Sequence, residues 1–97
     1  MTAPMQRRVP LTNNQVRVLN ALRAAQGRAT PTARDLLNAA PPYVNSPGEW
    51  ARPILNTLLR RGFVEKCGQG RHGSATWRIT GIGMGALEEA TRIGAAR

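Results

Sequence analysis

The pattern of apolar and polar positions divides the chain into helical segments followed by alternating ones. A capping box of Thr12 and Gln15 opens the first segment, because each side chain can accept a hydrogen bond from the other residue's backbone N–H. Gly27 fits the position after the last turn, so the segment predicts a helix over 13–26. The apolar stripe of this helix consists of Val18, Leu19, Leu22 and Ala25.

Two proline signals bound a second, shorter helix. Thr30 fits the cap position and Pro31 the first helical position. The pair Pro41–Pro42 ends the segment, since proline cannot continue a helix. The predicted inward stripe consists of Ala33, Leu36, Leu37 and Ala40.

The third helix shows the clearest division into two faces. Ser46 and Glu49 predict another capping box, and the helix runs over 47–61. Pro53 removes one backbone hydrogen bond, so we expect a kink or a late restart of the helix there. One face carries Ala51, Ile54, Leu55 and Leu58, and the opposite face carries Glu49, Arg52, Asn56 and Arg60.

The remaining chain alternates between apolar and polar positions before helical spacing returns. Residues 63–67 and 75–79 predict two strands, joined by the glycine-rich loop 68–74. Thr80 fits the cap of a last helix. The second strand turns Ala75, Trp77 and Ile79 to one face, and the last helix carries Met84, Leu87, Ala90 and Ile93. This order of elements predicts a single α+β domain that is mostly helical.

The net charge of the chain narrows the classes of partner that it can bind. The 97 residues contain 14 Lys and Arg against 5 Asp and Glu, which gives a net charge of +9. Such a balance favours nucleic acid, then an anionic membrane; a basic protein without a specific partner is the alternative. Residues 1–9 have no periodicity, so we expect a flexible basic arm whose Arg7 and Arg8 contact phosphates.

Two short motifs lie at the junctions of this order of elements. They are Leu55-x-x-Leu58-x-x-x-Gly62-Phe63-Val64 before the hairpin and Ile79-Thr80-x-x-Gly83 after it. With three helices ahead of a hairpin, the chain resembles the winged helix-turn-helix domains of MarR-like and related transcriptional regulators. The resemblance implies a winged helix over 10–80, with a two-stranded wing at 67–75, followed by a C-terminal helix over 81–97.

The resemblance also implies sequence-specific binding of double-stranded DNA by a small transcriptional regulator, of a size that suits a phage or plasmid gene. The third helix would enter the major groove, and the wing would lie on the minor groove or backbone. Arg52 would bind guanine O6 and N7, and Asn56 adenine N6 and N7; the alternative is an ordinary solvated helix face. The residues expected to contact DNA are Arg7, Arg8, Thr32, Arg34, Ser46, Glu49, Arg52, Asn56, Arg60, Gln69, Arg71 and His72.

Two further alternatives stay open. The same fold serves as a protein-interaction module, in this case within a phage recombination, replication or packaging complex. Met84, Leu87 and Ile93 pack either against the first helix or against their copies in a homodimer.

Other candidate chemistry is excluded by spacing. Gly68–Gly73 matches GxGxxG, but a strand follows where a dinucleotide site requires a helix. Cys67 and His72 are too few for a zinc site, and His72 has no nucleophile beside it, so we expect no metal, no cofactor and no enzyme activity. No segment resembles a secretory signal or a membrane span. With one cysteine, the chain suits a reducing cytoplasm, in the bacterial nucleoid or a phage-infected host.

Overall fold

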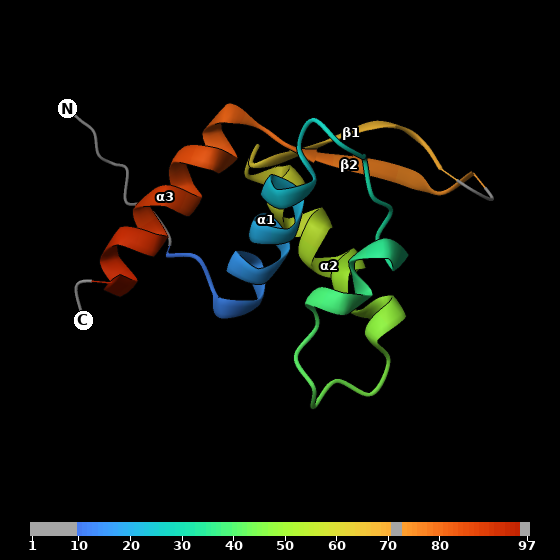
Figure 1. Cartoon of the computed structure of the whole chain (residues 1–97), viewed down its shortest axis with the longest axis horizontal. Coiled ribbons are helices and arrows are strands. Elements are labelled where there is room, and N and C mark those ends of the chain that lie inside the picture. The colour runs from blue at the N-terminus through green and yellow to red at the C-terminus, as the bar shows by residue number, and fades with distance from the viewer. Residues whose placement is uncertain (1–9, 71–72, 96–97) are drawn as a thin grey trace.

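The computed structural model describes residues 10–70 and 73–95 of the chain. The elements are, in order, α1 (Asn13–Ala25), the 3-10 helix η1 (Arg34–Ala39), α2 (Pro47–Arg60), the antiparallel strands β1 (Val64–Gln69) and β2 (Ala75–Ile79), and α3 (Gly81–Ala95). The predicted class, a mostly helical α+β fold, is confirmed. In Figure 1, α3 lies toward one end of the long axis and the hairpin extends toward the other, with α1 and α2 between them. Within the described ranges, no helix is both long and apolar enough to cross a membrane.

The core forms where α1, α2, the hairpin and α3 meet. The inward stripes predicted for the first and third helices are confirmed, because their central residues are almost completely buried. Leu87 of α3 joins this core with no exposed surface, so the internal packing alternative holds for this side chain. Dimerisation stays a prediction, and the side chain of Ile93 lies outside the described part of the structure. The buried apolar residues are Val18, Leu19, Leu22, Leu36, Ala51, Leu55, Leu58, Val64, Trp77, Ile79 and Leu87.

Both ends of α1 follow the sequence signals. Thr12 N–H donates to Gln15 Oε1 at 3.0 Å, and Gln15 N–H donates to Thr12 Oγ1 at 3.1 Å, which confirms the capping box. The helix ends at Ala25, just before the predicted bound, because Gln26 is already its C-cap. Gly27 then takes the left-handed conformation that glycine favours, with a φ of 81°.

The predicted start of the second helix at Thr30 is wrong. The helix η1 begins at Arg34 after Ala33, and two reciprocal hydrogen bonds span this start: Thr32 N–H donates to Asp35 Oδ2 at 3.0 Å, and Asp35 N–H donates to Thr32 Oγ1 at 3.2 Å. The reason is a contact with a distant part of the sequence. Trp77 N–H of β2 donates to the Pro31 carbonyl at 2.9 Å, so the chain is held against the hairpin before η1 begins.

The second helix also differs in type from the prediction. It is a 3-10 helix, which has about three residues per turn and presents a narrower inward face than an α-helix. Leu36 fills the inward position and is buried, whereas Leu37, predicted to share the stripe, is 37% exposed.

α2 follows the predicted division into faces but lacks the predicted cap. Ser46 makes no side-chain hydrogen bond to the helix, because its ψ of 75° departs from the extended backbone that positions a capping oxygen. Glu49, expected to complete the capping box, pairs with Arg52 instead. The helix runs without a break from Pro47 to Arg60 with Pro53 inside it, so the late restart expected at Pro53 does not occur.

The hairpin carries a bulge that the sequence pattern did not reveal. β1 extends further into the predicted loop than expected, and its register shifts at Cys67 after Lys66 has paired with Trp77. Trp77 is buried as predicted, but Thr76 is also buried, at 5% exposure. Thr32 forms a β-bridge with Thr76, so the segment before η1 lies along the edge of β2 beside this side chain.

α3 begins at the predicted cap. Thr80 Oγ1 accepts from Gly83 N–H at 3.0 Å, and the same hydroxyl donates to the Gly62 carbonyl at 2.7 Å. Gly83 lies so close to the chain entering β1 that an added Cβ would overlap the Phe63 carbonyl. The first turn of α3 is therefore fixed to the base of the hairpin.

Candidate nucleic-acid interface

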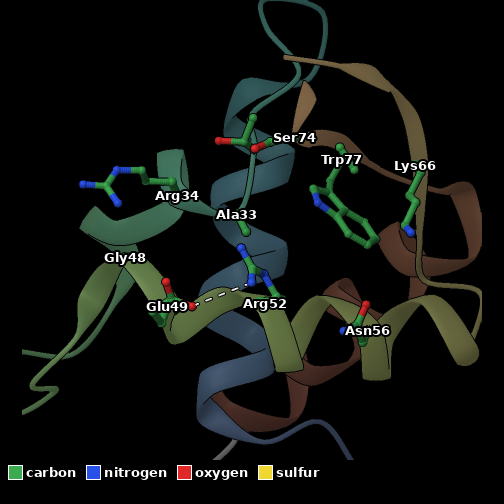
Figure 2. A pocket seen from close by; sticks show the side chains of 11 residues that line it. Ala33, Arg34, Gly48, Glu49, Arg52, Asn56, Lys66, Ser74 and Trp77 are labelled. Carbon is green, nitrogen blue, oxygen red and sulfur yellow. Dashed lines mark ion pairs between the residues drawn. The ribbon is translucent and has the colours of Figure 1, made fainter. Parts of the chain in front are cut away.

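A groove lies between α2, the start of η1 and the hairpin (Figure 2). Its volume is about 500 Å³. The lining residues are Thr32, Ala33, Arg34, Gly48, Glu49, Arg52, Asn56, Lys66, Ser74, Ala75 and Trp77. The structure thus brings together the predicted DNA-contacting residues Thr32, Arg34, Glu49, Arg52 and Asn56, from two separate segments of sequence.

Arg52 lies in the middle of the groove. Figure 2 shows its side chain pointing from α2 toward Ala33, with the hairpin on the other side. Arg52 Nη1 is 3.8 Å from Glu49 Oε1, and the two side chains are 66% and 68% exposed. A charge-assisted hydrogen bond is about 2.7–2.9 Å long, so this is a loose ion pair in contact with solvent.

Arg34 lines the groove at the start of η1, and in Figure 2 its side chain points away from Arg52 and the hairpin. A Cβ added to Gly48 would lie 3.4 Å from Arg34 Nη1, so the guanidinium lies within van der Waals reach of the first turn of α2. The two hydrogen bonds between Thr32 and Asp35 span Arg34 and hold the backbone at the start of η1.

Lys66 and Trp77 complete the groove from the hairpin, and sequence reasoning missed both as site residues. They are a cross-strand pair, and Lys66 Nζ lies 5.5 Å from the centre of the Trp77 ring, a cation–π distance. The alternation of β2 placed Trp77 in the core. The pairing of β1 with β2 adds Lys66 to the same face, and the bulge at Cys67 follows this pair.

On the outer face of the hairpin, the positive charge of Arg78 is balanced by the negative charge of Glu65. Arg78 Nε donates to Glu65 Oε2 at 2.7 Å. This hydrogen bond and the charge of the carboxylate raise the pKa of the Arg78 guanidinium above its ordinary value. Neighbouring strand residues point to opposite faces, so this pair lies away from Lys66. Among the described charged residues of the two strands, Glu65 and Arg78 pair with each other, and Lys66 carries its positive charge on the groove side.

The other predicted site residues lie elsewhere. Ser46 and Gln69 are exposed but do not line the groove. Arg60 lies further along the exposed face of α2, where its Nη2 donates to Thr57 Oγ1 at 3.5 Å. The predictions for Arg7, Arg8, Arg71 and His72 fall outside the described residues.

The groove offers hydrogen-bond donors in contact with solvent. Arginine, lysine and asparagine side chains of this kind bind phosphate oxygens and base edges. Among residues 10–70 and 73–95, no three His, Cys, Asp or Glu side chains come close enough to hold a metal ion. No protein-family model, curated protein or solved structure matches the chain.

Proposed function

We propose that this chain is a winged-helix domain that binds double-stranded DNA in a sequence-specific manner and acts as a small transcriptional regulator. In this proposal α2 lies in the major groove, which is about 12 Å wide and admits an α-helix. The β1–β2 hairpin is the wing and lies along the adjacent backbone or minor groove. The bridge between Thr32 and Thr76 supports the assignment, because it ties the segment before η1 to the hairpin and places both beside α2.

The observation that carries the proposal is the position of Arg52 and Asn56. Both are exposed on the face of α2 that lines the groove, one helical turn apart. Arginine binds the two acceptors of guanine, and asparagine binds the donor and acceptor of adenine. Arg34 and Lys66 flank this face from η1 and β1, where they suit contacts to phosphates that set the register of the helix on the duplex.

Selection of bound sequences from a random duplex pool, followed by competition with single-base changes, tests the proposal. Arg52→Ala should lose discrimination at one base pair by about 1–3 kcal/mol. Arg92→Ala is the matched control, since it removes the same charge from an exposed position of α3 that does not line the groove. Equal losses for both variants on every duplex would refute base reading by α2.

A protein-interaction module is the second candidate, and one surface favours it. Tyr43 is 77% exposed in the connection between η1 and α2, and Leu37 beside that connection is partly exposed. Exposed aromatic and aliphatic side chains of this kind are common in protein interfaces. If the protein binds neither duplex nor single-stranded DNA at low salt, this second function replaces the first.

A further inference from the structure

One acidic side chain lies in a groove that is otherwise basic. Among the described residues that line the groove, Arg34, Arg52 and Lys66 are cationic and Glu49 alone is anionic. Glu49 is in the first turn of α2, where a carboxylate often serves to cap the helix. Its carboxylate is instead directed to the Arg52 guanidinium, and the expected capping box is absent. Helix capping therefore does not account for the position of its side chain.

A carboxylate on a surface that meets DNA is unfavourable wherever it approaches a phosphate. Contacts to phosphates are independent of sequence and supply most of the affinity for random DNA. Glu49 repels those phosphates, and it also competes with them for Arg52. Because the ion pair is long and exposed to solvent, exchanging it for another partner of Arg52 requires little free energy.

Base edges offer Glu49 a partner that the backbone does not. The cytosine N4 amino group is a hydrogen-bond donor in the major groove, and carboxylates accept from it. Residues three apart on a helix are separated by about 4.5 Å along its axis. Base pairs are about 3.4 Å apart, so on a helix that lies along the groove Glu49 and Arg52 would face neighbouring base pairs.

We propose that Glu49 is a specificity-determining residue, which rests on the function proposed above. On random DNA its charge opposes binding and keeps Arg52 paired. At the preferred site Arg52 leaves Glu49 for a guanine, and Glu49 accepts a hydrogen bond from a cytosine at the neighbouring base pair. Glu49 thus lowers non-specific affinity more than specific affinity, which is how a repulsive element creates discrimination.

The experiment compares Glu49→Gln with Glu88→Gln on two duplexes, a random sequence and the sequence selected by the unaltered protein. Glu88 is exposed on α3 and does not line the groove, so both variants raise the net charge equally. Glu49→Gln should tighten binding to the random duplex by roughly 3- to 10-fold at low salt. Its affinity for the selected duplex should change less, and the preference for cytosine beside the guanine should weaken. Glu88→Gln should leave the ratio of the two affinities unchanged.

The failures of the two proposals are distinguishable. If the unaltered protein binds no duplex, both proposals fall. If it binds duplex and Glu49→Gln behaves like Glu88→Gln, only the role of Glu49 is overturned. Weaker binding of Glu49→Gln to random DNA would also overturn it, because the carboxylate would then be assisting phosphate contacts. Thermal melting of both variants verifies that the binding assays compare folded proteins.

Discussion

The helices α2 and α3 have similar inward faces and different outward faces. Each buries aliphatic side chains in the common core, Leu55 from α2 and Leu87 from α3. Outward, α2 presents Arg52 and Asn56 to a basic groove, whereas the charged residues at the end of the chain, 81–97, balance to zero. The two helices thus pack into the same core but differ in the charge that their outward faces present to a polyanion.

This difference separates stability from binding. Burial of apolar surface drives folding and is insensitive to the charge of the outward face. Long-range attraction to DNA depends on where exposed cations gather. Changes on the inward faces should therefore alter the free energy of unfolding. Changes on the outward faces should affect DNA binding only for α2.

The largest expected effect comes from the inward face of α3. Leu87→Glu places a charge without a partner in the core and removes the apolar packing of the leucine. Together these two losses should exceed the stability of a typical small domain, which is roughly 5–15 kcal/mol. The variant should be unfolded by circular dichroism. Ile82→Glu, at a residue of α3 that is 67% exposed, is the control and should fold. A folded Leu87→Glu monomer would mean that α3 does not belong to the core.

A smaller effect on stability distinguishes two glycines of α3. Gly83→Ala should destabilise the protein by about 1–3 kcal/mol, because the added methyl group overlaps the Phe63 carbonyl. In Gly85→Ala, the added Cβ has no neighbouring atom within 4 Å. It should stabilise the helix by about 0.4–1 kcal/mol by restricting the unfolded chain. Urea denaturation measures both changes, and equal effects would contradict the close approach of Gly83 to the hairpin.

The smallest effect compares the outward faces without changing charge. Asn56→Ala should lose about 1 kcal/mol of discrimination at one base pair, within the range of a single base contact. Thr91→Ala, at an exposed position of α3, should leave DNA binding unaltered. Both variants should unfold at nearly the same denaturant concentration as the parent protein, since exposed substitutions change stability by about 0.5 kcal/mol or less. If Thr91→Ala also changes base preference, α3 belongs to the interface and the contrast between the helices fails.

Local signals in the sequence predicted the regular elements well. The stripe of Leu55 and Leu58, the capping box at Thr12, and the cap at Thr80 all depend on residues within one or two turns. The capping box at Ser46 failed although its residues were present, because the backbone there does not place the hydroxyl toward the helix. A motif specifies which hydrogen bonds are available, while the path of the chain decides which are made.

Patterns within single segments were sufficient to predict the α+β class, the inward faces of α1 and α2, and the presence of Arg52 and Asn56 on the outward face of α2, since helical and strand periodicity act over short distances. The start of η1 and the set of residues that line the groove depend on contacts between segments. Trp77 N–H holds the Pro31 carbonyl, and the pairing of β1 with β2 sets Lys66 opposite Trp77. These contacts link residues far apart in the chain, and no periodicity within one segment encodes the pairing of two.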